Sequence, residues 1–275
     1  MDKLPYINLG CGSTFNESWV NIDFTSTGKD VIAHNLTQGI PFNDNSFKAV
    51  YHSHVLEHFT KSDAEKFISE CHRILNLGGV LRVAIPDLEV IARNYIKYLE
   101  ASLNNDSSAI EKYNWTMLEM YDQTIRQKEG GEMIDYILDI SRNNDAFLIE
   151  RNGSETKKLI ENLRNFKNIS ATEKKSGKFS LYNLKSRIKN KLIRTLLKDD
   201  FKALQIGKFR LSGEIHQWMY DRYSLSVLLK KNGFSNVKVV SATESKIPDW
   251  NSFNLDVING LVRKPDSLFM EGQKL

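Results

Sequence analysis

Cysteine is scarce in this chain of 275 residues, which contains only Cys11 and Cys71. Two cysteines cannot build the disulfide framework of a small secreted domain, and they lack the paired spacing of a zinc site. Long apolar runs are also missing, since no stretch approaches the roughly 18 residues that a membrane-spanning helix needs. The first residues, MDKLPYINLG, favour a strand and show no signal-peptide pattern. We therefore expect a soluble, cytoplasmic protein without structural disulfides, and we predict no metal site.

Charge of one sign is concentrated in a single segment. Residues 151–210 contain 17 Lys and Arg against 5 Asp and Glu, a net charge of +12. The whole chain has a formal net charge of only +4, so the remaining residues sum to −8. Apolar residues make up 41% of the chain, which is too much for a disordered protein and enough for a folded core. The sequence thus predicts a globular protein with one strongly basic segment.

Short β-type runs alternate with helical patterns over the first 90 residues. The predicted strands cover 6–9, 19–23, 31–34, 47–51 and 80–85. Between the last two, apolar residues recur every three or four positions from Ala64 to Leu75, and Ser62 or Asp63 is the expected N-cap of that helix. This alternation is typical of a parallel sheet covered by helices.

The pattern is helical from about residue 88 to 210 and returns to β near the end. A helix is expected over 224–232, and strands are expected over 237–240 and 267–272, whereas the polar stretch 168–178 is typical of a loop or a disordered tip. We predict one α/β sheet interrupted by a large helical insertion. Residues 1–100 and 213–275 would form the sheet domain, and 101–212 would form a basic cap that selects the substrate.

Two glycines follow the first predicted strand, and an acid ends the second. Gly10 and Gly12 would let the backbone approach a ligand closely, while Asp23 could accept hydrogen bonds from both hydroxyls of a ribose. This arrangement favours a cofactor that contains a nucleoside. The alternative is a plain tight turn beside a solvated acid.

Further motifs lie at the expected strand ends. They are Asn35-Leu36, the stretch IPFNDNSF at 40–47, HSHVLEH at 52–58, RILNLGG at 73–79 and GEIHQWMYD at 213–221. In order and spacing these residues resemble the class I S-adenosylmethionine (SAM)-dependent methyltransferases, and more closely a small branch encoded among bacterial polysaccharide-biosynthesis genes. The resemblance covers 5–90 and, less strongly, 213–275, and says almost nothing about 101–210. It implies a Rossmann-like, mostly parallel sheet whose last strand is antiparallel.

The resemblance also implies a set of cofactor-binding residues. Gly10 and Gly12 would line SAM, Asp23 would hold its ribose, Asn35 and Leu36 would flank the adenine, and Ser53 and His54 would lie near the methionine end. The backbone around Leu9 and Cys11 completes this set.

The sequence departs from the family pattern at two points. Thr14 replaces the third glycine, and only ten residues separate Gly12 from Asp23. The first helix is therefore predicted to shrink to about one turn. This argues against NAD, whose pyrophosphate needs the N-terminus of a full helix.

Methyl transfer to a hydroxyl needs an aligned acceptor and a base that removes its proton. The candidates at strand ends and beyond the insertion are His54, Glu57, His58, Asp87 and His216. A histidine suits work near neutral pH best, because its unperturbed pKa is about 6.5. Structural alternatives stay open: Asp87 could cap the following helix, Glu57 and His58 could lie on a solvated helix face, and His216 could pack on Trp218.

The basic segment has three interpretations. Leucine and isoleucine side chains share one face of a helix predicted over 181–198, with lysines and arginines around the rest, as in a helix at a membrane surface. The cations could instead bind an anionic sugar nucleotide or glycan. An ordinary cap helix is the third interpretation. RNA is less favoured because aromatic residues are not interleaved with the lysines, and we expect no DNA binding.

These observations predict a SAM-dependent O-methyltransferase that acts on a sugar hydroxyl, in an activated sugar or glycan intermediate of bacterial surface polysaccharide. Alternatives are a phosphate-like or other small-molecule acceptor, or RNA. From a different class, the chain could be a catalytically silent SAM-fold module that binds and scaffolds a glycan enzyme.

Overall fold

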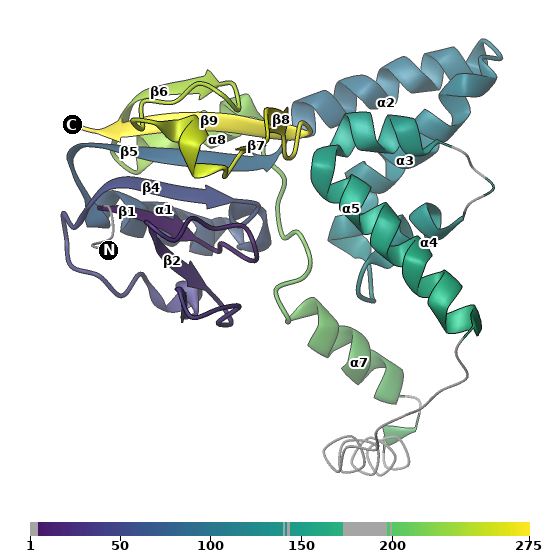
Figure 1. Cartoon of the computed structure of the whole chain (residues 1–275), viewed down its shortest axis with the longest axis horizontal. Coiled ribbons are helices and arrows are strands. Elements are labelled where there is room, and N and C mark those ends of the chain that lie inside the picture. The colour runs from purple at the N-terminus through teal and green to yellow at the C-terminus, as the bar shows by residue number, and fades with distance from the viewer. Residues whose placement is uncertain (1–4, 140, 142–143, 173–196, 199) are drawn as a thin grey trace.

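The computed structural model describes residues 5–139, 141, 144–172, 197–198 and 200–275. A sheet domain and a helical part lie side by side (Figure 1). The strands are β1 (Tyr6–Leu9), β2 (Val20–Asp23), β3 (Val31–Ala33), β4 (Phe47–Ser53), β5 (Leu75–Pro86), β6 (Phe234–Val240), β7 (Val257–Ile258), β8 (Leu261–Val262) and β9 (Ser267–Lys274). The helices are α1 (Lys61–Ile74), α2 (Leu88–Leu103), α3 (Ser107–Ile125), α4 (Gly131–Leu138), α5 (Asp145–Thr172), α7 (Asp200–Arg210) and α8 (Arg222–Lys231), with short 3-10 helices η1 (Leu36–Gln38), η2 (Leu56–His58) and η4 (Trp250–Phe253).

The main sheet has the strand order β3-β2-β1-β4-β5-β9-β6. The pairs among β1 to β5 are parallel, whereas β9 lies antiparallel between β5 and β6. The expected mostly parallel sheet with an antiparallel last strand is thus confirmed. The prediction missed the start of β5, which begins at Leu75, directly after α1.

Helices α1 and α8 cover one face of this sheet. Leu81, Val83 and Ile85 of β5 point into a core that contains the apolar sides of both helices. The N-cap of α1 is Thr60, whose hydroxyl accepts the backbone N–H of Asp63. The prediction of Ser62 or Asp63 as the cap was wrong, because the helix begins two to three residues earlier than either would allow.

Aromatic side chains and a loop cover the other face. The connection between β1 and β2 contains turns and no helix, so the predicted single helical turn was wrong. Trp19 lies at the centre of this face, 5.1 Å from the rings of Tyr6 and Phe253. Trp250 of η4 packs against it from the loop between β6 and β7. This loop replaces the helix for which ten residues leave no room.

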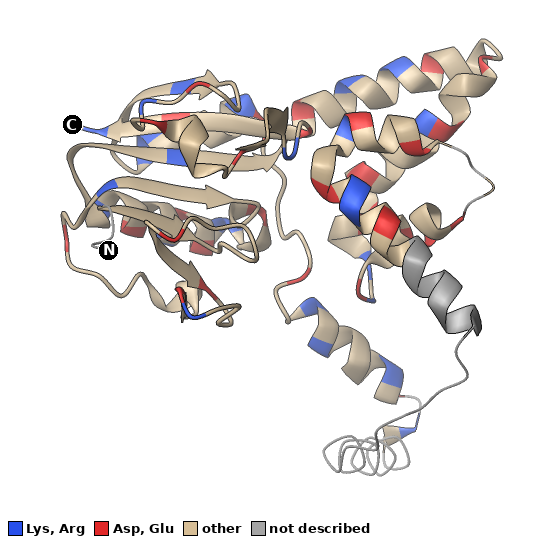
Figure 2. Cartoon of the chain, in the orientation of Figure 1, with Lys and Arg blue, Asp and Glu red and all other residues tan. Residues whose placement is uncertain are grey.

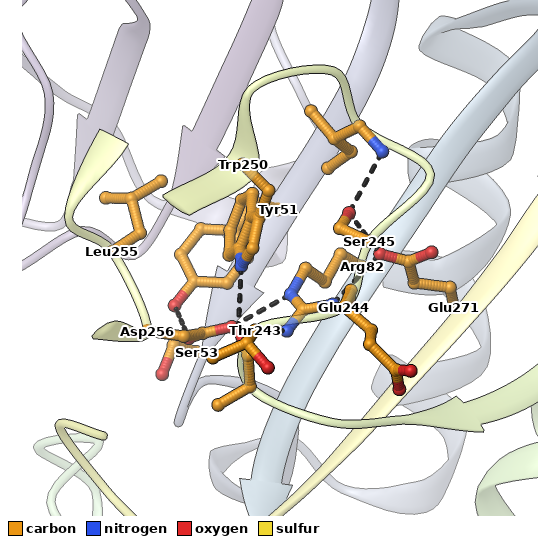
Figure 3. Close-up of polar contacts among 12 residues, drawn as sticks. Tyr51, Ser53, Arg82, Thr243, Glu244, Ser245, Trp250, Leu255, Asp256 and Glu271 are labelled. Atoms are coloured by element: carbon orange, nitrogen blue, oxygen red, sulfur yellow. Dashed lines mark hydrogen bonds and ion pairs between the residues drawn. The ribbon is translucent and has the colours of Figure 1, made fainter. Parts of the chain in front are cut away.

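Arg82 of β5 is fully buried beneath that loop (Figure 3). Its guanidinium donates to the carboxylates of Asp256 at 2.8 Å and Glu271 at 2.9 Å. It also donates to three backbone carbonyls of the loop, those of Ser241, Ala242 and Glu244. The network therefore ties the central strands to the loop that covers them.

The helical part leaves and re-enters the sheet domain at adjacent points. The backbone N–H of Leu88, at the start of α2, donates to the carbonyl of Tyr220 at 3.1 Å. Helices α3, α4 and α5 bury a core of their own around Trp115, Tyr136, Ile137, Leu148 and Ile160. This part is thus an inserted unit with separate packing.

Some sequence-based expectations fall on residues that the structure does not describe. Residues 168–172 lie in α5, and 173–178 are outside the described residues, as is the predicted membrane-surface helix over 181–198 except for Leu197 and Lys198. Helix α7 carries several basic side chains (Figure 2). Across the described part of the chain, no helix has the length and apolarity needed to cross a membrane.

Candidate active site

The carboxyl ends of β1, β2 and β4 meet at one edge of the sheet, as parallel pairing requires. Gly10 and Gly12 both have left-handed backbones, with φ of 66° and 55°. A side chain on Gly10 would collide with Val55, because its Cβ would lie 2.4 Å from Val55 Cγ2. At Gly12 nothing lies within 4 Å of such a Cβ, so a ligand can approach this backbone closely.

Asp23 meets the glycine loop directly. Its Oδ2 accepts the backbone N–H of Gly12 at 2.7 Å, and its carbonyl accepts the N–H of His34 at 2.8 Å. Phe24, the next residue, has 69% of its surface exposed although it is a large apolar side chain. Sequence reasoning missed Phe24, and the signal was an apolar residue directly after the acid that ends a strand.

The other cofactor candidates differ in what their side chains can reach. Leu9 and Cys11 are buried, and burial raises the pKa of the Cys11 thiol to about 12, so they offer backbone rather than side-chain contacts. Asn35 accepts the N–H of Thr37 and so caps η1, which places Leu36 half-buried at the same edge. Ser53 accepts a hydrogen bond from Arg263 at 2.9 Å, so its hydroxyl already has a protein partner.

His54 follows β4 and has an unusual backbone for a histidine, with φ of 56°. This turn aims the ring at two partners. Nδ1 lies 3.2 Å from Oε1 of Glu57, and Nε2 lies 2.9 Å from the hydroxyl of Ser267, at the start of β9. Burial and the nearby cations Lys264 and Arg263 hold the pKa of His54 well below its usual value, so the ring is neutral at neutral pH.

Three more of the predicted catalytic residues lie together beside His54. The backbone carbonyl of Glu57 accepts the N–H groups of Gln217 and Trp218, which brings the segment returning from the insertion onto η2. The rings of His58 and His216 then meet edge to face, 4.9 Å apart. Burial lowers the pKa of both imidazoles and raises that of Glu57 to about 8.

Asp87 is placed differently. Its Oδ1 accepts the backbone N–H groups of Glu89 and Val90 and so caps α2. Burial raises the pKa of Asp87. These contacts support the capping interpretation that the sequence left open.

A cavity of about 420 Å³ opens between His54 and the inserted helices. Its polar lining includes Glu119, Arg126, Asn152, Lys264 and Asp266, and the half-buried side chains of Met133 and Ile134 add an apolar surface. Asn152 bridges two of these carboxyl groups, since its amide donates to Glu119 and to Asp266. Sequence reasoning assigned no role to these lining residues, because most come from helices that the motifs do not cover. The volume fits a small molecule.

The edge near the glycines fits a nucleoside cofactor. Gly12 leaves open space over its backbone, Asp23 offers a carboxylate for ribose hydroxyls, and Phe24 offers an exposed ring for a base. The cavity beside His54 lies at the same edge, but Gly12 and Asp23 do not line it, so it is available for a second molecule.

Comparisons with known proteins agree with this geometry. Residues 8–83 match the model of a methyltransferase domain. A search of curated proteins found no match.

Similar solved structures include a SAM-dependent methyltransferase from Thermotoga maritima, described as a possible histamine N-methyltransferase. It is 14% identical, with 98% of this chain and 82% of that chain covered and a TM-score of 0.40. A SAM-dependent methyltransferase from Archaeoglobus fulgidus is 9% identical, with 99% and 86% covered and a TM-score of 0.39.

The matched residues 8–83 contain the end of β1, the strands β2 to β4, most of β5, and the glycine loop with Asp23. The strand order and the antiparallel β9 complete the Rossmann-like arrangement. Residues 8–83 thus form a methyltransferase domain within a class I, Rossmann-like fold, and S-adenosylmethionine is the cofactor that this domain implies.

Proposed function

We propose that the protein transfers a methyl group from SAM to a hydroxyl of a sugar, in a nucleotide-activated sugar or a glycan intermediate of bacterial surface polysaccharide. The reaction would take place in the cytoplasm, before the glycan is exported. The polysaccharide pathway rests on the motifs at 40–47 and 52–58, which resemble the branch of the family encoded with such genes.

The observation that carries the sugar proposal is an unpaired carboxyl oxygen in the wall of the cavity. Asp266 lines it, and its buried Oδ1 has no hydrogen-bond partner. A buried polar atom without a partner is costly, so a ligand that donates a hydrogen bond there is favoured. A sugar hydroxyl is such a donor.

His54 is the residue best placed to accept the proton of that hydroxyl. SAM supplies an electrophilic methyl group, so the protein needs to orient the acceptor and remove one proton. Glu57 lies beside Nδ1 of His54, and Nε2, which contacts the hydroxyl of Ser267, would exchange that contact for the acceptor hydroxyl. A positioned base of this kind contributes about 10²–10⁴ in rate.

Two cations in the cavity wall support an anionic substrate. Arg126 and Lys264 both line it, and Lys264 pairs with Glu155 at 3.2 Å. The buried Nε of Arg126 has no hydrogen-bond partner. A phosphate of a sugar nucleotide would supply the acceptor that this donor lacks.

The first experiment measures binding of SAM and S-adenosylhomocysteine by calorimetry. Asp23→Ala should weaken both by about 10- to 100-fold, because a hydrogen bond to a charged group contributes about 1.5–3 kcal/mol. Glu17→Ala, which removes an exposed acid from the loop before β2, should bind both ligands normally. Normal binding by Asp23→Ala would remove this acid from the cofactor site.

The second experiment measures methyl transfer to nucleotide sugars and glycan intermediates. Asp266→Asn should raise the KM for the acceptor about tenfold and leave SAM affinity unchanged, because one charged hydrogen bond is weakened. His54→Gln should lower kcat with SAM affinity retained. Transfer only to RNA or to acceptors without a sugar hydroxyl would contradict the proposal, while the methyltransferase assignment would stand.

A further inference from the structure

Three groups with metal-binding atoms converge beside His54. Glu57 and His58 come from η2, and His216 comes from the segment that returns from the insertion. One ligand atom of each side chain lies within 4.8 Å of the other two. Among the described residues, this is the group of His, Cys, Asp and Glu side chains that meets a metal-site geometry.

The polar atoms of this group are buried and poorly satisfied. Neither carboxylate oxygen of Glu57 has a hydrogen bond, although Oε1 lies 3.2 Å from Nδ1 of His54. Nδ1 of His216 also has no partner, and both residues are at most 5% exposed. Folded proteins rarely leave such atoms unpaired, and an ion is one of the usual reasons.

His58 is oriented as a metal-bound histidine would be. Its Nδ1 lies 3.2 Å from the carbonyl of Ile215, which can only accept a hydrogen bond, so Nδ1 carries the proton. The lone pair is then on Nε2. A ligand histidine normally donates its other N–H to a carbonyl or carboxylate in this way.

The backbone holds the three groups in place without a ligand. The carbonyl of Glu57 accepts the N–H of Gln217 at 2.7 Å, and the N–H of His216 donates to Gln123 of α3 at 2.9 Å. The convergence is therefore part of the packing between η2, α3 and the return segment. Such preorganisation favours binding.

We propose that Glu57, His58 and His216 bind one divalent transition-metal ion, zinc in preference. Two imidazoles and one carboxylate form a donor set that suits zinc and iron(II), whereas magnesium and calcium favour oxygen ligands. The ion joins the sheet domain to the return of the insertion, and Glu57 carries its influence to His54. This departs from the sequence-based prediction of no metal, because His216 lies 158 positions after His58 in the chain.

The test uses the full chain, treated with a chelator and then freed of it, without SAM or acceptor. Titration with Zn²⁺ in a calorimeter should give one ion per chain, and Co²⁺ should give the visible absorption bands of a site with nitrogen and oxygen ligands. Glu57→Gln and His216→Gln should each weaken Zn²⁺ binding by roughly a hundredfold or more, since even indirect partners of a metal contribute about 10- to 100-fold.

His72→Gln is the matched control, because His72 lies on α1 and packs against Phe234, outside this group. It should bind Zn²⁺ as the unchanged protein does. Binding of S-adenosylhomocysteine shows that each variant is folded. No Zn²⁺ or Co²⁺ bound by the unchanged chain, or equal binding by His216→Gln, would overturn the proposal and leave the methyltransferase assignment untouched.

Discussion

His52, two residues before His54, is a neutral histidine buried in the core of the sheet domain. His52 has no exposed surface, neither of its ring nitrogens has a hydrogen bond, and its ring packs edge to face on Phe67 of α1. Burial lowers the pKa of His52 to about 3. In the unfolded chain the same ring takes up a proton near pH 6.5.

We therefore predict that His52 makes the protein less stable as the pH falls. Its contribution is complete above about pH 6.5 and decreases toward pH 3, because only the unfolded state binds the proton in that range. Between pH 7.5 and pH 5 the loss should be about 2 kcal/mol. His52→Phe should remove this part of the pH dependence, as measured by urea unfolding at both pH values. If the variant and the unchanged protein lose equal stability, His52 is protonated in the folded state.

Gly10 and Gly12 share a left-handed backbone but have different surroundings. Substitutions at the two positions therefore separate the cost of the backbone conformation from the cost of a steric clash. Alanine at either position should cost about 1–2 kcal/mol for the unfavourable φ. Gly10→Ala should cost more, because its Cβ would lie 2.4 Å from Val55 Cγ2. When Gly10→Ala is combined with Val55→Ala, the clash is removed. The additional loss in free energy of unfolding, relative to Gly12→Ala, should then be recovered. Equal losses for the two single variants would show that the contact with Val55 is relieved by movement.

At the scale of elements, β5 and the loop before β7 depend on the buried Arg82. Arg82→Met should cost about 3–5 kcal/mol, because the carboxylates of Asp256 and Glu271 then lose their buried counter-charge. Arg93→Met removes an exposed partner of Glu89 and should cost less than about 0.5 kcal/mol. Urea unfolding measures both changes. A loss below about 1 kcal/mol for Arg82→Met would mean that the loop rearranges to hydrate the carboxylates.

The strands were predictable from the sequence where the apolar pattern lies within a few neighbouring residues. The runs that became β1, β2, β3, β4 and β9 were found in the sequence because each is a short apolar run bounded by turns. The meeting of Gly12 and Asp23 followed from parallel pairing. Arg82 gave no such signal, because its partners lie 159 to 189 positions later in the chain.

Other errors have equally specific causes. The helix expected between β1 and β2 is absent because the loop containing Trp250 covers that face, and its sequence is far from Trp19. The cavity residues Asn152, on α5, and Arg126, directly after α3, were missed because polar residues in and beside these helices look solvent-facing in the sequence. Only packing brings them to the carboxyl end of β4.

At the scale of the whole molecule, the insertion is attached at two neighbouring points. Because the N–H of Leu88 is hydrogen-bonded to the carbonyl of Tyr220, a short glycine linker can replace residues 88–219. The shortened chain should bind S-adenosylhomocysteine with an affinity within about tenfold of the full chain and transfer no methyl group. Calorimetry and a transfer assay check this.

The same variant with Asp23→Ala serves as the control and should bind S-adenosylhomocysteine about 10- to 100-fold more weakly than the shortened chain. A folded but non-binding shortened chain would show that the inserted helices complete the cofactor site. Retained methyl transfer would show that the acceptor does not use the cavity beside His54.

The position of β9 between β5 and β6 also matters while the chain is being made. The antiparallel partner of β5 begins at Ser267, long after β5 ends at Pro86. At a synthesis rate of about 5–20 residues per second, that edge of β5 stays unpaired for roughly 10–40 s. During that interval a 12-residue apolar strand could pair with a neighbouring nascent chain. Arg82 in the middle of this strand opposes such pairing, because its charge finds partners only when the end of the chain arrives. We therefore expect the buried arginine to limit aggregation of the unfinished protein as well as to stabilise the finished one.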